Sequence, residues 1–465
     1  MRVILHADLN NFYASVEVKL NPSLQGKFVG VCGNAENRHG IILAKSIPSK
    51  KYQIQTGESV TDAKKKCPDL VLVPPNYELY EKCSHAFMKI LRKYTDVVEQ
   101  YSIDEAFLDM SGTKELFGPP IDVAHRMKDE IYHTLGFTVN VGISENKLLA
   151  KMAGDLKKPN MVHTLYRNEI AEKMWPLPVS DLFFCGRATE RKLHGLGIKT
   201  IGEIANADIN LLKFHLKKQG EIIWNYANGY DSTPVVQVAP PNKGYGNSTT
   251  TSFDVADEKV ADAVLLSLAE SVGRRLRRDG KRIKVVSVGI RYYDLSYISH
   301  QSVLISATNI TEEIWKVACR LFREAWDGMP VRHLGIHTSK VQEEDVGRQL
   351  SLFDQYDYEK MEKLDAAIDE IRLRFGSDAV MRATFAKENK MSISKDMDLV
   401  YDLKLADKDS LIHGRSDLEY WGRWMYNNLN PEQKKAWDAH YDVVIEKFNE
   451  ANLSGEELDK WKYQQ

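Results

Sequence analysis

Cysteine is scarce in this sequence and shows no clustered spacing. The five residues are Cys32, Cys67, Cys83, Cys185 and Cys319. Because none forms a CxxC pair, neither a zinc site nor a disulfide framework is expected. The scattered set favours reduced thiols and a cytoplasmic protein.

Long hydrophobic runs are also missing. No apolar stretch approaches the roughly 20 residues that a membrane-spanning helix needs, so no membrane association is expected. The opening "MRVILHADLN" resembles a signal peptide only in Arg2, and its apolar run is interrupted by His6 and Asp8. We therefore expect a buried strand over residues 2–8.

A large excess of one charge is absent as well, since the net charge is −2. The charge is nevertheless unevenly distributed. Residues 391–465 contain 10 Lys and Arg against 15 Asp and Glu, a net of −5, which leaves +3 on residues 1–390. Within the latter, "GRRLRRDGKRIK" (273–284) holds seven basic residues and one acid. This segregation indicates a basic working body and an acidic appendage.

The length of 465 residues exceeds what one core usually holds, so several domains are expected. Up to about residue 166, strands and helices mix in a pattern that predicts an α+β domain on a largely antiparallel sheet. Residues 167–230 look all-helical, and 237–250 ("QVAPPNKGYGNSTT") read as a linker. Two helices and three strands between residues 257 and 339 predict a second small α/β unit.

Two neighbouring acids, Asp104 and Glu105, interrupt an apolar segment in "YSIDEAFLDM". Consecutive side chains of a strand point to opposite faces, so both acids can serve one site only at a turn. We expect them at a hairpin tip, near Asp8 at the end of the first strand. Three carboxylates from two strands suit a pair of Mg²⁺ ions and in-line phosphoryl displacement. Solvated strand-end acids are the alternative, which the residues alone favour.

Three separated segments, "ADLNNFYASVE", "YSIDEAFLD" and "VGISENKLLAKMAGDLKKPN", resemble the Y family of translesion DNA polymerases in order and distance. The resemblance covers Met1 to about residue 355. It implies a low-fidelity, template-directed DNA polymerase that adds dNTPs to a primer, in DNA repair and the SOS response. Proofreading is not expected, because the sequence shows no exonuclease-like cluster of acids outside the palm. The resemblance also implies a right-hand architecture with an α+β palm, small fingers, a helical thumb with a helix-hairpin-helix, and an α/β little finger. The implied bounds are 1–20 and 74–166 (palm), 21–73 (fingers), 167–238 (thumb) and 242–340 (little finger).

The resemblance assigns the metal and nucleotide residues one by one. Asp8, Asp104 and Glu105 would be catalytic and would bind two Mg²⁺ ions, with Mn²⁺ as a substitute and the Leu9 carbonyl completing one shell. The implied nucleotide-binding residues are Phe12, Tyr13, Ala44, Lys50 and Lys158. Tyr13 would be a steric gate whose ring occupies the space of a ribose 2′-OH, and Lys158 would meet the triphosphate.

The finger segment departs from the DNA polymerase IV pattern. Where many relatives have Thr, Tyr and Arg, this chain has Ala44, Ile47 and Lys50, and Lys lacks the planar fork of Arg. With "GNSTT" (246–250), the segment looks closer to the UmuC-like, polymerase V type branch. Small residues such as Ala44 and Ser46 would leave a roomy site for the new base pair.

The resemblance also implies contacts with primer-template DNA. "FFCGRATERKLHGLGIKTIGEI" resembles the thumb motif that binds phosphates at a helix N-terminus, although Phe184 replaces its first glycine. The basic run would neutralise phosphates from the little finger. The expected DNA-binding residues are Gly186, Arg274, Arg275, Arg277, Arg278, Lys281, Arg282 and Lys284.

Past the little finger, "RQLSLFD" lies in a linker (346–355) and resembles the peptide that docks on the bacterial sliding clamp. Gln349 would be the polar anchor, and the apolar contacts would come from Leu350, Leu352 and Phe353. An accessory subunit is a further expected partner.

The remaining residues, 356–465, form an extension without a family interpretation. Residues 391–465 hold four of the eight tryptophans, and they could cover the basic groove, bind a partner or act as a spacer. Two rival functions also stay open: a non-catalytic clamp-binding repair scaffold and a metal-dependent nuclease.

Overall fold

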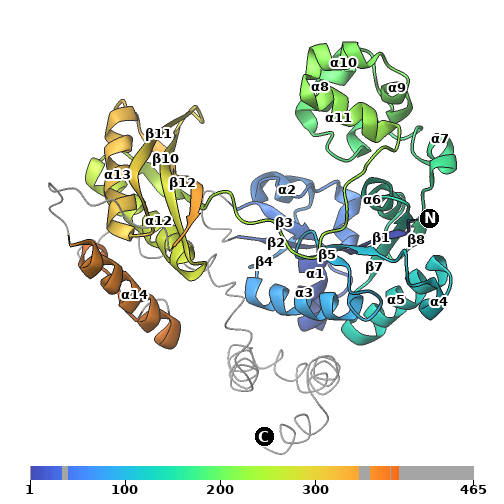
Figure 1. Cartoon of the computed structure of the whole chain (residues 1–465), viewed down its shortest axis with the longest axis horizontal. Coiled ribbons are helices and arrows are strands. Elements are labelled where there is room, and N and C mark those ends of the chain that lie inside the picture. Colours follow the sequence, from blue (N-terminus) through green and yellow to red (C-terminus); the bar gives the residue numbers. More distant parts are fainter. Residues whose placement is uncertain (1, 34–39, 345–356, 377–378, 387–465) are drawn as a thin grey trace, which may run out of the picture. The chain divides into compact units, whose positions relative to one another are not determined.

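The computed structural model describes residues 2–33, 40–344, 357–376 and 379–386 (Figure 1). It contains two compact units, one running up to Ala239 and the other starting at Pro240. No helix in these ranges is long and apolar enough to cross a bilayer. The α+β class that the sequence predicts is confirmed in both units.

A five-stranded sheet forms the centre of the first unit. Its strands are β1 (Ile4–Leu9), β5 (Val98–Gln100), β6 (Glu105–Asp109), β7 (Val139–Ser144) and β8 (Val162–Thr164). They lie in the order β5-β6-β1-β7-β8, and every pair is antiparallel except β7 with β8. The predicted N-terminal strand is therefore the central one, and Asp8 lies near its C-terminal end.

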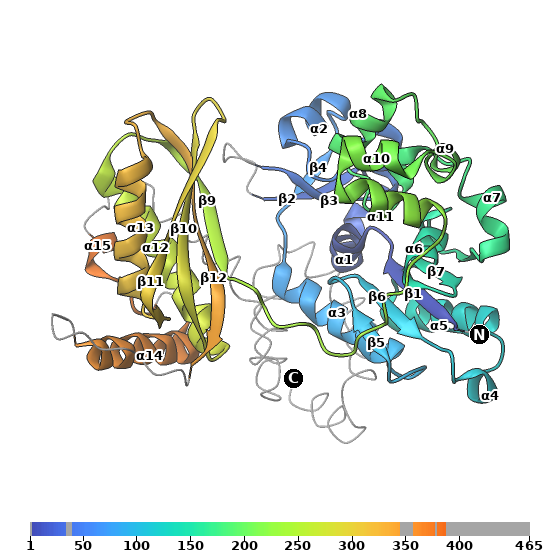
Figure 2. The same cartoon turned by 45° about the horizontal axis from the view of Figure 1, so that its top comes forward.

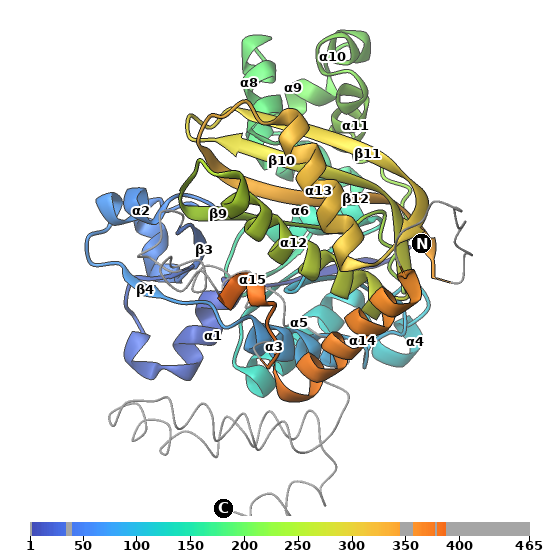
Figure 3. The same cartoon turned by 90° about the vertical axis from the view of Figure 1, so that its left-hand side faces the viewer.

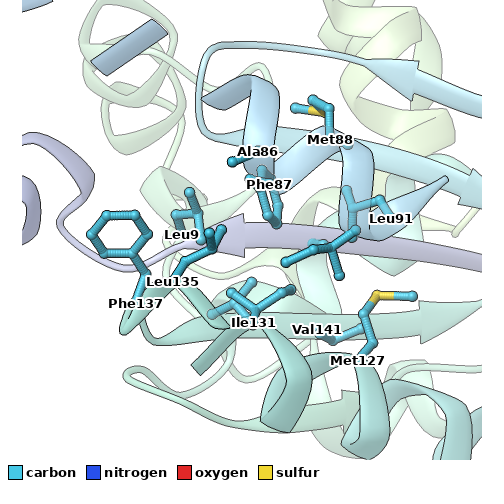
Figure 4. Close-up of a cluster of buried hydrophobic side chains, with 14 of the residues drawn as sticks. Leu9, Ala86, Phe87, Met88, Leu91, Met127, Ile131, Leu135, Phe137 and Val141 are labelled. Carbon is cyan, nitrogen blue, oxygen red and sulfur yellow. The ribbon is translucent and has the colours of Figure 1, made fainter. Parts of the chain in front are cut away.

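One face of this sheet holds the main hydrophobic core. Leu5, Ala7 and Leu9 of β1 join a buried cluster with α3 (Tyr77–Leu91) and α5 (Pro120–Leu135). Figure 4 shows side chains from both helices meeting Leu9 and Val141 of the sheet. Because strand side chains alternate between faces, the even-numbered residues of β1 point the other way.

The opposite face is covered by α6 (Lys147–Asp155), which lies over β1 and β7 (Figure 2). The approach is close because β7 has a glycine: a Cβ on Gly142 would lie 1.9 Å from the Ala150 carbonyl oxygen. His6 and Asp8 of β1 lie on this face. The polar residues of the sheet are thus enclosed between the strands and α6.

A smaller sheet follows α1 (Phe12–Leu20) in the chain. It has the order β3-β2-β4, with β2 (Val29–Cys32), β3 (Ile42–Lys45) and β4 (Val71–Val73). A buried cluster joins this sheet to α2 (Val60–Lys66).

As predicted, residues 167–230 contain helices and no strands. These are α7 (Ile170–Lys173), α8 (Arg187–Gly195), α9 (Ile201–Ala205), α10 (Ile209–Leu216) and α11 (Lys218–Ala227). Their apolar side chains form a separate core that also includes Leu148, Leu149 and Met152 of α6.

The second unit is a four-stranded antiparallel sheet with two helices. The strands β9 (Gly246–Val255), β10 (Lys281–Tyr292), β11 (Tyr297–Thr308) and β12 (Val331–Glu343) have the order β11-β10-β12-β9. The helices α12 (Glu258–Arg278) and α13 (Thr311–Ala325) pack on one face (Figure 3).

The prediction of a linker over 237–250 was wrong at its end, because residues 246–250 begin β9. The run "GNSTT" has no apolar alternation, so its sequence shows no strand signal. It is nevertheless an edge strand, and it pairs only with β12 on one side.

The first part of the C-terminal extension belongs to the second unit. Helix α14 (Tyr358–Phe375) begins with the side chain of Asp357 as its cap, and the short α15 (Ala383–Ala386) follows. Phe385 is buried against Ala263 and Leu266 of α12. The expected clamp residues Gln349, Leu350, Leu352 and Phe353, like residues 391–465, lie outside the described residues.

Candidate functional site

Three carboxylates lie together at one end of the large sheet. Asp8 and Glu105 are directly opposite each other in the antiparallel pair of β1 and β6, so their side chains share a face. Asp104 precedes β6 in a bend, where its carbonyl accepts a hydrogen bond of 3.0 Å from the Leu9 amide. This bend replaces regular alternation, which lets two consecutive acids serve one region. Leu9 ends β1 beside them.

Glu105 is held by two residues that the sequence analysis did not select. Lys151 of α6 donates to Glu105 Oε2 at 2.7 Å, and Nε2 of the fully buried His6 lies 3.3 Å from the same oxygen. Burial opposes ionisation of Glu105, but His6 and Lys151 outweigh it and lower its pKa to about 2. Strand periodicity could have pointed to His6, since it lies two residues before Asp8. Lys151 reaches the site only because α6 packs on the sheet.

The pKa values of Asp8 and Asp104 shift in the opposite direction to that of Glu105. Burial raises the pKa of Asp8, although an ion pair with Lys158 offsets part of this rise. Burial also raises the pKa of Asp104; a hydrogen bond of 2.6 Å from Ser102 Oγ opposes it, whereas the charges of Asp8 and Glu105 add to it. Repulsion among the three acids is therefore present in the protein alone, and a cation would relieve it.

The donor set suits a hard divalent cation, because all three groups offer carboxylate oxygens. No three His, Cys, Asp or Glu side chains of the described residues are arranged to enclose a metal ion. Two of the three acids are ion-paired: Lys158 is bonded to Asp8, and Lys151 to Glu105. The residues therefore fit divalent ions chemically, and binding them would require at least one ammonium group to move.

Two of the expected nucleotide residues lie within electrostatic reach of Asp8. Burial and the charge of Lys158 lower the pKa of Lys50, and Asp8 opposes this. Burial disfavours the charged form of Lys158, but the carboxylates of Asp8 and Asp155 outweigh it and raise its pKa. The charge of Asp8 therefore acts on both lysines.

Tyr13 and Phe12 start α1 but point to different surroundings. Tyr13 is half-buried, and burial together with the negative potential of Tyr77 and Asp104 raises its pKa to about 12. Ala44 packs against the same core cluster as Tyr13. Phe12 is only 3% exposed and packs edge-on to Phe137. The side chain of Phe12 therefore belongs to the core, and a role of this residue in nucleotide binding stays a prediction.

The expectation for Ser46 also requires correction. Its hydroxyl is buried and donates to the Lys27 carbonyl at 2.9 Å, while it accepts from the Val29 amide. Ser46 thus faces the interior of the small sheet and adds no space to a nucleotide site.

In the helical segment, Phe184 has a backbone conformation that is typical of glycine. Phe184 has φ of 68° and is 56% exposed, and its carbonyl accepts a hydrogen bond from Gln219. The left-handed conformation costs a non-glycine residue roughly 1–2 kcal/mol. Gly186 is the N-cap of α8, with open space around its Cα. Position 184 therefore has a backbone conformation typical of glycine although its residue is phenylalanine, and phosphate binding by this segment stays a prediction.

Most of the basic run is ion-paired within the second unit. Arg277 is mostly buried and contacts Asp365 and Asp369 of α14 at 3.0 and 2.7 Å. Arg282 pairs with Glu362 of α14 at 2.9 Å. Arg277 and Arg282 therefore hold α14 in place, and the expectation that they bind phosphate does not fit this conformation.

The other basic side chains of the run have different contacts. Arg275 donates to the Gly246 carbonyl at 2.5 Å, Arg278 pairs with Asp279, and Lys281 pairs with Glu343. Among the residues that the structure describes, no ion-pair partner is seen for Arg274 or Lys284. These two are the strongest remaining candidates for phosphate contacts.

Comparison with known proteins identifies the family. Residues 7–155 match the impB/mucB/samB family model, and residues 242–352 match the model of that family's C-terminal domain. The DNA polymerase IV of Clostridium acetobutylicum is 40% identical over 84% of this chain and 99% of its own length. The DNA polymerase IV of Acetivibrio thermocellus is 41% identical over 84% and 99%, and DNA polymerase IV 1 of Bacillus subtilis is 37% identical over 83% and 94%.

A solved structure agrees with the sequence matches. A Y-family DNA polymerase chimera of Dbh and Dpo4 covers 73% of this chain and 99% of its own, with a TM-score of 0.65 and 26% identity. The right-hand polymerase fold expected from the sequence is thereby confirmed. Neither the scaffold nor the nuclease alternative is supported by these matches.

Two expectations are overturned. The assignment to the UmuC-like branch was wrong: it depended on a few finger and strand residues, whereas the similarity to DNA polymerase IV extends along most of the chain. The expected end of the resemblance at about residue 355 was also wrong, because 84% of 465 residues is about 390. At least part of the α14–α15 region is therefore shared with these relatives. The chain belongs to the Y family of DNA polymerases, with relatives named DNA polymerase IV, and is a DNA-directed DNA polymerase.

Proposed function

We propose that Asp8, Asp104 and Glu105 bind two Mg²⁺ ions, with Mn²⁺ as a substitute, for nucleotidyl transfer during low-fidelity translesion synthesis. The observation that carries this proposal is the direct pairing of Asp8 with Glu105, with Asp104 in the adjoining bend. In family members generally, divalent metals serve the reaction. When bound, such ions polarise the phosphate and stabilise the attacking and leaving oxygens of an in-line displacement.

The protein's own residues contribute position and charge. The primer 3′-hydroxyl attacks the α-phosphate of a dNTP, and pyrophosphate leaves. We propose that Lys158 and Lys50 approach the triphosphate, since both are near Asp8. Lys158 would exchange its ion pair with Asp8 for phosphate oxygens, which keeps its charge compensated. Tyr13, beside Asp104, would contact the sugar and exclude a 2′-hydroxyl.

Metal dependence tests this proposal. Primer extension by the full-length chain should be absent in EDTA and should return on addition of Mg²⁺ or Mn²⁺ in excess of the chelator. The physical reason is that the carboxylates and the phosphates are all negatively charged. Without a divalent ion, the two lysines are not able to bridge these groups. Extension in EDTA equal to that in Mg²⁺ would refute the role of the ions. A primer-template lacking the primer 3′-hydroxyl is the negative control.

The domain boundaries remain proposals that the fold supports. A palm of 1–20 and 74–166 would contain the large sheet, and fingers of 21–73 would contain the small one. The thumb (167–238) would be the helical part, and the little finger (242–340) the four-stranded sheet with α12 and α13. Gly186, Arg274 and Lys284 would then contact primer-template DNA, and a bacterial cytoplasm is the proposed location.

We also propose that residues 346–355 bind the sliding clamp through "QLSLF". Replacing Leu352 and Phe353 with alanine should remove the stimulation of synthesis by the clamp, because two apolar anchors are lost from a short peptide. Synthesis without the clamp should be unchanged, which controls for folding. The measurement is product length on primed circular DNA with and without clamp. Equal stimulation of the variant and the parent by the clamp would place the clamp site elsewhere. If the chain also has an accessory subunit, adding that subunit should stimulate synthesis when no clamp is present.

A further inference from the structure

The proposed sugar gate rests on an unusual aromatic support. Tyr13 stacks on Tyr80 with ring centroids 4.1 Å apart and planes within 15°. Tyr77 meets Tyr13 edge-on at 6.1 Å. Tyr80 has no exposed surface, whereas Tyr13 is half-buried. One face of the Tyr13 ring is therefore placed against a buried neighbour.

Tyr80 is fixed at its other end by a buried acid. Its hydroxyl donates to Glu17 Oε1 at 2.5 Å, and Glu17 is only 8% exposed. Burial raises the pKa of Tyr80, so the hydroxyl keeps the proton it donates. Burial also raises the pKa of Glu17, although the bond from Tyr80 opposes this. A buried carboxylate therefore holds the phenol in one position.

The helical spacing explains how Tyr80 reaches both groups. Tyr13 and Glu17 are four residues apart in α1, so they lie on one face of that helix. Helix α3 lies beside α1 (Figure 1) and presents Tyr80 to this face. The ring of Tyr80 thus contacts Tyr13, and its hydroxyl contacts Glu17, one turn later in α1.

We infer that Tyr80, anchored by Glu17, is a positioning residue that holds Tyr13 for discrimination between deoxyribose and ribose. This inference rests on the proposed role of Tyr13 as the gate. A ring excludes a hydroxyl only if it cannot tilt away, and a face-to-face contact with a fixed ring resists such tilting. Tyr80 itself would touch neither the nucleotide nor the metal ligands.

The experiment measures single insertions of dCTP and CTP opposite a template guanine by the full-length chain. The quantity compared is the ratio of kcat/KM for dCTP to that for CTP. Tyr80→Leu should lower this ratio about threefold to tenfold, the effect of losing one aromatic contact. The change should come from a lower KM for CTP, while kcat for dCTP stays within about threefold. Tyr80→Phe keeps the ring without its anchor and should give a smaller fall.

The matched control is Tyr94→Leu. Tyr94 is also a buried tyrosine, its hydroxyl donates to Glu130 at 2.6 Å, and it packs on Phe117, beyond the far end of α3 from Tyr80. Tyr94→Leu should lower the stability of the protein without changing the ratio of kcat/KM for dCTP to that for CTP. Glu17→Gln, which keeps an acceptor for the Tyr80 hydroxyl, should also leave the ratio unchanged.

Tyr13→Ala separates this inference from the gate proposal. An unchanged ratio in Tyr13→Ala would refute the gate itself. A lower ratio in Tyr13→Ala with the parental ratio in Tyr80→Leu would overturn only the role of Tyr80. Equal losses for dCTP and CTP in Tyr80→Leu would likewise overturn it, since they indicate a structural role alone. If Tyr80→Leu does not fold, the ratio of Tyr80→Phe decides, and a parental value counts against the inference.

Discussion

Primer extension falls about a thousandfold or more when Asp104 and Glu105 are both replaced with alanine: this is the largest effect we expect for any variant of this chain. The two changes remove the acids from the bend that faces Asp8, and with them the oxygens that would hold the divalent ions. Preorganised charge at a reacting centre usually supplies several orders of magnitude in rate, and each group lost costs roughly a hundredfold to a thousandfold. The rate of single-nucleotide insertion in a rapid-quench experiment is the measurement.

A matched carboxylate in the same strand provides the control. Asp109 is the last residue of β6, and its side chain accepts hydrogen bonds from the Ser111 amide and hydroxyl. Asp109→Asn should therefore keep nearly full activity. Circular dichroism should show that both variants are folded. Insertion by the folded Asp104→Ala, Glu105→Ala variant within tenfold of the parent would show that these acids do not hold the catalytic ions.

Arg277→Ala should destabilise the second unit by about 3–5 kcal/mol, the usual cost of removing one partner from a buried ion pair. Its Nη1 contacts Asp365, which is 4% exposed, and also donates to the Asn309 carbonyl at 2.7 Å. Without Arg277, Asp365 would keep Arg382 at 3.4 Å but lose its nearer cation in an interior position, where weaker compensation of the charge is costly. Urea unfolding, together with hydrogen exchange in α12 and α14, measures this loss.

The comparison with Arg274→Ala makes the result specific. Arg274 belongs to the same helix, α12, and no described residue forms an ion pair with it. We expect Arg274→Ala to leave stability nearly unchanged, to weaken DNA binding, and to reduce the slope of log K against log salt by about one. Arg277→Ala should keep the parental slope. A stable Arg277→Ala variant with a reduced slope would instead assign Arg277 to the phosphate contacts.

A run of basic residues by itself does not indicate which of its side chains bind DNA and which form ion pairs inside the protein. Seven cations in twelve residues indicate a charged surface, but Arg277 and Arg282 find their acidic partners in a helix eighty or more residues later in the chain. The acids of α14 also have no local signal that distinguishes a buried ion pair from a solvated helix face. Only packing of α14 against α12 separates the two cases.

The elements with strong local patterns were predictable from the sequence. The apolar run of β1, the all-helical residues 167–230 and the acid doublet each follow from periodicity or from residue type. Edge strand β9 was not, because its polar residues need a partner strand on only one side. Phe184 shows a similar limit: its left-handed backbone, with φ of 68°, is a conformation that phenylalanine by itself disfavours.

The sequence by itself determined the order of the elements, the carboxylates Asp8, Asp104 and Glu105, and the family to which they point. Tertiary structure alone decided that Lys151 and His6 hold Glu105, that Arg277 binds α14, and that Tyr80 supports Tyr13. The physical reason is the range of the interactions. Periodicity and turn chemistry act within a few residues, whereas ion pairs, stacking and burial join positions that become neighbours only after the chain has folded.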